Sequence, residues 1–216
     1  MFALSDDLLN GVRDFGRGGV VMKKFIANGG EGGPIQFSGD GKRFMRSASN
    51  GTGAAVIAAL MLHRAVAGGY IPVGYVCESF SVLVSGPGCA YQPWHCDLWE
   101  EQRYDIQGHL YYSALYFVDA SDLLVDLPCG GRRVSLAAGD MVVFGGGCRH
   151  GGGCNPGEGL SVRVHTFFRW AGHGGSDRPK FFNYFKALDA AEQTRLNNEA
   201  MGSEVVLGES VLSFTS

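Results

Sequence analysis

The sequence predicts a mainly β fold, a sandwich or barrel of short strands with flanking helices. Short apolar segments rich in β-branched and aromatic residues follow one another between residues 76 and 170. Turn sequences separate them, for example Gly86-Pro-Gly before residue 89 and Pro128-Cys-Gly-Gly. Strands that recur at such short spacing are typical of sandwiches and barrels. The chain has 216 residues, of which 45% are apolar, so one domain can bury a substantial core.

Helices are expected on both sides of this strand region. Ser5 can cap a helix that runs to about Phe15. The small, apolar residues 52–67 predict a buried helix, and residues 181–201 predict a more polar one. His63 falls within the apolar helix, where we expect it to be a packed core histidine. These helices should pack on the outside of the strands.

The strands themselves are expected at residues 76–85, 110–118, 123–127, 132–136, 141–144 and 160–170. They outline a core of about residues 70–172 within one domain, 1–216, and the helical extensions are 1–69 and 173–216. The last strand alternates, and one of its faces carries Ser161, Arg163, His165, Phe167 and Arg169. Such a face can lie in water. Its position soon after His150 favours a face that lines a cavity.

A candidate metal site begins at His95 and Asp97. In an extended backbone, alternate side chains point the same way and lie about 6.6 Å apart, so both can bind one ion. His150 follows farther along the chain. Two imidazoles and one carboxylate that leave open positions are the facial triad of non-haem Fe(II) oxygenases. The sequence therefore predicts a mononuclear iron site, with His95, Asp97 and His150 as catalytic metal ligands.

The segments around these residues resemble the Fe(II)/2-oxoglutarate-dependent dioxygenases. The resemblance covers roughly residues 75–172 and rests on Gln92-Pro-Trp-His-Cys-Asp-Leu-Trp, on Gly139-Asp-Met-Val-Val-Phe-Gly-Gly-Gly-Cys-Arg-His150 and on Ser161-Val-Arg-Val-His-Thr-Phe-Phe-Arg169. It implies a double-stranded β-helix, or jelly roll. It also implies that a basic residue after the second histidine binds the distal carboxylate of 2-oxoglutarate. By position this residue is Arg163, with Arg169 as the alternative, and a guanidinium suits a carboxylate.

The same resemblance implies Fe(II) as cofactor and 2-oxoglutarate and O₂ as cosubstrates, with succinate and CO₂ released. The last strand is partly like that of the AlkB-type dealkylases: Arg163 and Arg169 match their R-x-N-x-T-x-R signature, whereas His165 and Phe167 do not. We expect hydroxylation of a small molecule or protein side chain. An AlkB-like nucleic-acid oxidative demethylase and a non-catalytic jelly-roll metal-binding module are the alternatives.

Substrate contacts are expected from side chains around the open face of the metal. The candidates are Trp94, Trp99, Glu100 and His165, together with Tyr91 and Phe167. Packing at the rim is the alternative for the aromatic residues, because aromatics are common large core formers.

Charge and hydropathy limit the partners. The net charge of −3 and the pI near 6.0 disfavour a strong nucleic-acid binder, although Lys23-Lys24, Lys42-Arg43 with Arg46, and Arg132-Arg133 could form a basic patch.

No apolar run reaches about 18 residues, and the first residues carry acids where a signal peptide is basic. We expect a soluble, intracellular protein, cytoplasmic or nuclear, with no membrane partner and with a small-molecule or peptide substrate.

Cysteine and glycine usage adds two expectations. The six cysteines show no CxxC spacing, which favours free thiols. Cys148, His150 and Cys154 could supply three zinc ligands as an alternative, although structural zinc usually takes four ligands from paired elements. Among the 34 glycines, those at 145–153 are loop signals rather than a phosphate-binding motif.

Overall fold

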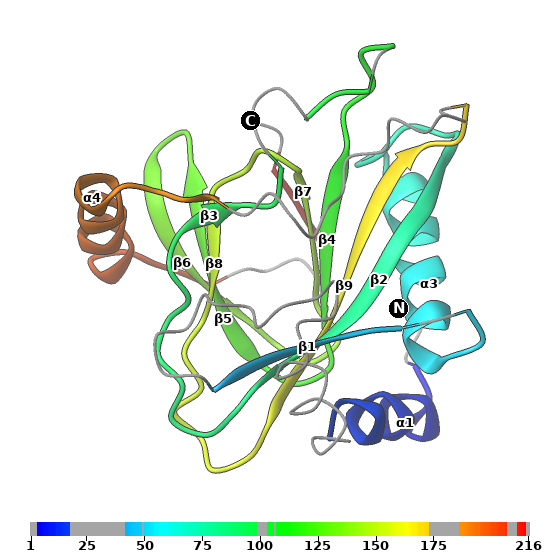
Figure 1. Cartoon of the computed structure of the whole chain (residues 1–216), viewed down its shortest axis with the longest axis horizontal. Coiled ribbons are helices and arrows are strands. Elements are labelled where there is room, and N and C mark those ends of the chain that lie inside the picture. Colours follow the sequence, from blue (N-terminus) through cyan, green and yellow to red (C-terminus); the bar gives the residue numbers. More distant parts are fainter. Residues whose placement is uncertain are drawn as a thin grey trace.

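Two β-sheets make up most of the computed structural model, which describes residues 4–17, 42–48, 50–98, 103–105, 107–172, 186–206 and 211–214. The first sheet has the order β1 (Arg43–Ser47), β2 (Tyr75–Ser85), β9 (Ser161–Trp170), β4 (Tyr112–Phe117), β7 (Met141–Gly145) and β12 (Val211–Phe214). The second has the order β10 (Lys186–Ala187), β3 (His95–Cys96), β8 (His150–Gly152), β5 (Ser121–Leu127), β6 (Gly130–Leu136) and β11 (Glu204–Val206). The two sheets face each other (Figure 1), which confirms the predicted mainly β jelly roll.

In the central strands, successive side chains point to opposite faces of the sheet, and this alternation explains how the two sheets pack. The interior between the sheets is apolar where β4, β5, β6 and β7 meet, with Leu115 and Phe117 from the first sheet against Leu123 and Val125 from the second. On β9, the odd-numbered residues share this inner face and the even-numbered ones point outward, because successive strand side chains alternate. Both faces of β9 are buried over residues 161–168, so its polar face lies inside the protein rather than in water.

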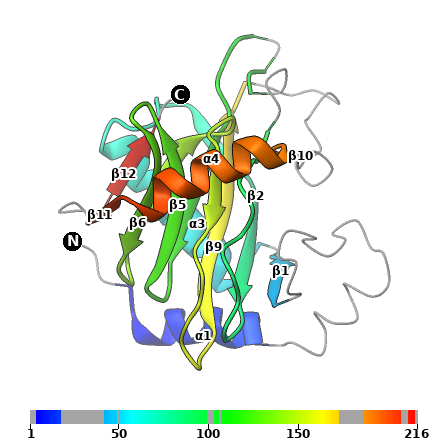
Figure 2. The same cartoon turned by 90° about the vertical axis from the view of Figure 1, so that its left-hand side faces the viewer.

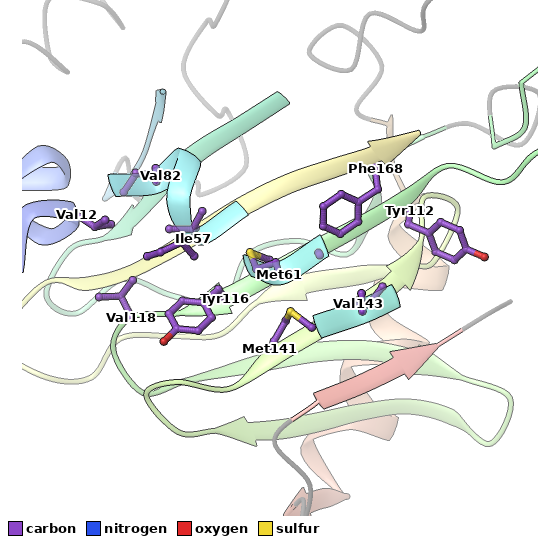
Figure 3. Close-up of a cluster of buried hydrophobic side chains, with 14 of the residues drawn as sticks. Val12, Ile57, Met61, Val82, Tyr112, Tyr116, Val118, Met141, Val143 and Phe168 are labelled. Atoms are coloured by element: carbon purple, nitrogen blue, oxygen red, sulfur yellow. The ribbon is translucent and has the colours of Figure 1, made fainter. Parts of the chain in front are cut away.

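The outer face of the first sheet is covered by helices α1 (Asp6–Arg17) and α3 (Gly53–Ala67), as Figures 1 and 3 show. Thr52 caps α3, because its side chain accepts a hydrogen bond from the backbone N–H of Ala55. Ile57 and Met61 from α3 pack against outward-facing side chains such as Phe168 of β9. His63 lies on the opposite, exposed side of α3. The expectation of a core histidine was wrong, because α3 buries only the face toward the sheet.

The outer face of the second sheet is covered by α4 (Ala190–Met201), which lies across β5 and β6 in Figure 2. Leu196 and Ala200 pack there against Trp94 and Leu124. The helix begins at Ala190 rather than near residue 181, because the Asp189 side chain caps it by accepting from the backbone N–H of Glu192. Lys186–Ala187 is a strand, and residues 181–185 lie outside the described part of the chain.

The expected strands of the core are present, with bounds that differ by one or two residues. The expected helical extensions also contribute strands: β1 precedes residue 70, whereas β10, β11 and β12 follow residue 172 and extend both sheets. The pairings of β11 with β6 and of β12 with β7 are parallel. Among the described residues, no helix has the length and apolar character needed to cross a membrane.

Candidate metal centre and buried arginines

The three predicted metal ligands meet in the interior, next to the second sheet. His95 on β3 and His150 on β8 are register partners of two adjacent strands (Figure 1), and Asp97 lies in the bend that follows β3. One ligand atom from each residue lies within 4.8 Å of the others. Both histidines are 5% exposed and the Asp97 side chain is 10% exposed. Sequence spacing and strand pairing thus bring together a group that could hold a metal ion.

Backbone carbonyls fix the orientation of both imidazoles. His95 Nδ1 lies 2.9 Å from the carbonyl oxygen of Pro93, and His150 Nδ1 lies 3.1 Å from that of Cys148. A carbonyl can only accept, so both Nδ1 atoms carry the proton and both Nε2 atoms keep a lone pair for a metal. Burial lowers the pKa of His95 to about 3, with the charge of His150 adding to the effect. Burial likewise lowers the pKa of His150. Both rings are therefore neutral near pH 7.

The Asp97 carboxylate directs its two oxygens toward different groups. Oδ1 lies 3.7 Å from His150 Nε2 and 4.0 Å from His95 Nε2. Oδ2 lies 2.6 Å from Ser113 Oγ and 3.3 Å from His165 Nε2. Burial opposes ionisation of this carboxyl, but its interactions with His150 and His165, including the hydrogen bonding of His165, outweigh burial and hold its pKa well below the usual range.

This donor set fits a divalent metal. A metal requires neutral imidazoles and an ionised carboxylate, which are the protonation states that the local environment favours. Nitrogen and oxygen donors from two histidines and one carboxylate, without a thiolate, are the set found in facial-triad Fe(II) sites.

Arg163 lies on the inner face of β9 and is a buried cation. It is 3% exposed, its Nη2 donates to Ser85 Oγ at 3.3 Å, and its guanidinium carbon lies 6.0 Å from the centroid of the Phe117 ring. Burial, and then the charge of Arg43, lowers its pKa to about 9, so it remains charged at neutral pH. Within the described residues, no carboxylate forms an ion pair with Arg163. A buried charge without a counter-charge is costly, which is typical of a binding site for an anion.

A second buried arginine, Arg43 on β1, lies beside Arg163. Its Nη1 donates to Ser85 Oγ at 2.8 Å, and its Nη2 donates to the carbonyl oxygens of Ala90 at 2.6 Å and Gly152 at 3.2 Å, and to that of Gly153. In the sequence, Lys42-Arg43 with Arg46 was a possible basic surface patch. That was wrong, because pairing of β1 with β2 brings Arg43 opposite Ser85 and turns it inward.

The glycines after His150 allow this close approach. A Cβ atom on Gly152 would lie 2.8 Å from Arg43 Nη1, 2.9 Å from Arg163 Nη2 and 2.9 Å from Gln92 Oε1. A side chain here would displace at least one of these groups. Gly151 and Gly152 belong to strand β8 rather than to a loop, and Gly152 leaves room for two guanidinium groups near the candidate metal ligands.

The other predicted site residues have different positions. Arg169 forms an ion pair with Glu78, whereas Arg163 has no carboxylate partner in the part of the chain that the structure describes. Trp94 is fully buried, and its Nε1 donates to Asn197 Oδ1 of α4 at 2.9 Å. It is therefore a packing residue of the outer face rather than a substrate contact.

Of the remaining candidates, some lie near the site. His165 is buried on the inner face of β9 and Phe167 packs beside it, with ring centroids 4.6 Å apart. Tyr91 is half-buried and donates to Asp122 Oδ2 at 3.3 Å. Trp99 and Glu100 lie outside the described residues.

The alternative zinc site is not assembled among the described residues. Cys148 packs in the apolar interior, where burial raises its thiol pKa to about 12, and the candidate metal group contains neither Cys148 nor Cys154. All six cysteines are free thiols, as expected.

Comparisons with known proteins bear on the fold. No protein-family model matches the chain, and no curated protein matches it in sequence. EvdMO1, a protein of known structure, is 17% identical with a TM-score of 0.50, over 76% of this chain and 45% of its own length. This chain therefore spans less than half of EvdMO1. A prolyl-4-hydroxylase from Pseudomonas putida is 20% identical with a TM-score of 0.48, over 78% of this chain and 89% of its own. At such identities the likeness concerns the fold alone.

Proposed function

We propose that this protein is an Fe(II)- and 2-oxoglutarate-dependent dioxygenase that hydroxylates a C–H bond of a small molecule or protein side chain. One observation carries the proposal: a His95, Asp97 and His150 group that could hold a metal shares the protein interior with a buried, positively charged Arg163. The open positions of a facial triad can bind a chelating cosubstrate, and the buried charge of Arg163 favours an anion beside it. A dicarboxylate keto acid meets both conditions.

In this proposal His95 Nε2, His150 Nε2 and Asp97 hold the iron. The metal with its cosubstrates supplies oxidation of an unactivated C–H bond, chemistry that side chains alone do not provide. The residues of the chain fix the protonation states: the carbonyls of Pro93 and Cys148 keep the protons on Nδ1, so both Nε2 atoms keep a lone pair for the metal.

Arg163 is the proposed partner of the distal carboxylate of 2-oxoglutarate. Its guanidinium lies next to Gly152. Gly152 is two residues from His150, which is about 6.6 Å along an extended strand. This separation is on the scale of a five-carbon dicarboxylate that reaches from the metal ligands to the cation. A planar guanidinium can donate two parallel hydrogen bonds to a carboxylate.

Apolar side chains surround both the candidate metal ligands and Arg163 and exclude water there. The Phe144 ring lies beside His150, with ring centroids 4.5 Å apart, and Phe117 lies beside Arg163. Both phenylalanines are fully buried. Low polarity strengthens the attraction between Arg163 and an anion and keeps water from the reacting groups.

The test is succinate release from iron-loaded protein supplied with 2-oxoglutarate in air, with and without candidate substrates. We expect succinate from the wild type, and none after chelation of the metal or in Asp97→Ala. Metal binding without consumption of 2-oxoglutarate would instead identify a non-catalytic metal-binding jelly roll. A methylated oligonucleotide belongs among the candidate substrates, since formaldehyde release from it would identify an AlkB-like demethylase.

A further inference from the structure

Ser113 and His165 surround the Asp97 oxygen that faces away from the two histidine ligands. Ser113 Oγ lies 2.6 Å from Asp97 Oδ2 and 2.7 Å from His165 Nε2. His165 Nε2 also lies 3.3 Å from the same carboxylate oxygen. Ser113 on β4 and His165 on β9 belong to the first sheet, whereas His95 and His150 belong to the second. Asp97 is thus held from one sheet and faces the metal ligands of the other.

The order of donors and acceptors in this group follows from the chemistry of its members. A serine hydroxyl has one proton to donate, and an ionised carboxylate can only accept. Ser113 therefore donates to Asp97 Oδ2, and its oxygen accepts a hydrogen bond from the Nε2–H of His165. An Nε2 atom that carries a proton has no lone pair for a metal. His165 therefore serves as a donor in this arrangement, and it is not a member of the group of three residues that could hold a metal ion.

Burial makes these contacts informative. Ser113 is 0% exposed and His165 is 9% exposed, and the next inward-facing residue of β4, Leu115, belongs to the apolar interior. A buried polar group without a hydrogen-bond partner destabilises the fold, so packing alone would favour apolar residues at these two positions. Instead, Ser113 forms a hydrogen bond to Asp97 Oδ2, and His165 forms one to Ser113.

We propose that Ser113 and His165 are positioning residues that hold Asp97 so that it binds the metal through Oδ1 alone. The inference rests on the proposed metal centre and assigns two residues that the triad does not include. Oδ1 is the oxygen that faces His95 Nε2 and His150 Nε2. With Oδ2 engaged by the Ser113 hydroxyl, which His165 in turn orients, Asp97 occupies one metal position instead of two. The extra position stays open for the cosubstrates.

Titration of metal-free protein with Co(II) tests this proposal without any turnover. Co(II) is a divalent ion whose visible absorption depends on the number and kind of its ligands. Ser113→Ala and His165→Gln should each weaken Co(II) binding by about 10- to 100-fold, the usual effect of losing a hydrogen bond to a metal ligand. Their Co(II) spectra should also differ from that of the wild type, because Asp97 is then free to bind through both oxygens. Ser113→Thr keeps the hydroxyl and should restore the affinity and the spectrum.

Ser161→Ala is the matched control, because Ser161 is a buried serine on the inner face of β9, four residues from His165. It should leave Co(II) binding unchanged. Equal affinity and an identical spectrum in wild type, Ser113→Ala and His165→Gln would overturn the positioning role while leaving the metal centre intact. If the wild type itself binds no Co(II), the metal centre fails, and this proposal fails with it. Should Ser113→Ala not fold, His165→Gln carries the test alone.

Discussion

Arg43 and Arg163 share one hydroxyl: Arg43 Nη1 donates to Ser85 Oγ at 2.8 Å, and Arg163 Nη2 donates to the same atom at 3.3 Å. The hydroxyl oxygen accepts from both guanidinium groups, so its own proton is available to a further acceptor. Two buried positive charges and one available hydroxyl proton form a group suited to bind a carboxylate. In the sequence, Ser85 was no candidate for any site, and Arg43 was considered only as part of a possible basic surface patch.

Arg43→Gln should destabilise the protein and weaken the binding of 2-oxoglutarate. The change removes donors to Ser85 and to the carbonyl oxygens of Ala90 and Gly152. Leaving buried acceptors without a partner costs about 1–3 kcal/mol of unfolding free energy. Urea unfolding measures this loss. Lys42→Gln, at the exposed neighbouring position, should change stability by no more than about 0.5 kcal/mol. Equal stability of both variants would show that Arg43 does not hold β8 and the residue 85–90 segment together.

Gly152→Ala should weaken binding of 2-oxoglutarate more than binding of the metal. The added methyl group would lie less than 3.0 Å from atoms of Arg43, Arg163 and Gln92, so a guanidinium must move. Overpacking of this kind costs about 1–3 kcal/mol. If the two arginines move as a result, the dissociation constant of 2-oxoglutarate should rise about tenfold. Calorimetry with 2-oxoglutarate and separately with Co(II) measures the two effects. In Gly159→Ala, where the new methyl meets nothing within 4 Å, both constants should stay at the wild-type values.

Ile57→Ala should lower the unfolding free energy by about 2–5 kcal/mol, the usual cost of truncating a large core side chain. Ile57 is 0% exposed on the face of α3 that packs against the first sheet, whereas its neighbour Val56 is 48% exposed. Val56→Ala should change the same quantity by no more than about 0.5 kcal/mol. Similar losses in both variants, measured by denaturant unfolding, would contradict the docking of α3 on the sheet.

Much of the fold could be predicted from the sequence because the strands of the core carry clear periodic patterns. The alternation in residues 160–170 placed Arg163 and His165 on one face, and that face is indeed buried between the sheets. The short strands β3, β8 and β10 have two or three residues, too few to show a pattern. The parallel strands β11 and β12 pair with partners far away in the sequence, which no local signal reveals.

The group of three candidate metal ligands could be predicted because His95 and Asp97 lie two residues apart, and strand pairing then adds His150. Ser113 could not be, because a serine within an apolar strand has no motif, and only the folded arrangement brings it to Asp97. Trp94 was misplaced for a related reason. It adjoins His95 in the chain, but alternation along the segment turns it to the opposite side, against α4.

Nucleic-acid oligomers should bind weakly. The net charge is −3, Arg43 is buried, and Arg169 is already paired with Glu78, so the described arginines offer less basic surface than the sequence suggested. Phosphate contacts would make affinity fall steeply with salt. Binding of short single- and double-stranded oligonucleotides at low and moderate salt measures this. Tight, salt-sensitive binding, together with demethylation of a methylated base, would favour the AlkB-like alternative over hydroxylation of a small molecule or protein side chain.

The most direct test of the proposed site is a calorimetric titration of 2-oxoglutarate into Fe(II)-loaded protein in the absence of O₂. The wild type should bind one equivalent, and binding should depend on the metal. Loss of one partner of a buried charge pair costs about 2–5 kcal/mol, so Arg163→Leu should weaken binding roughly 30-fold or more. Arg169→Leu should retain the wild-type constant, because Arg169 is paired with Glu78 instead. An unchanged constant in Arg163→Leu, or equal binding with and without metal, would contradict a single site formed by His95, Asp97, His150 and Arg163.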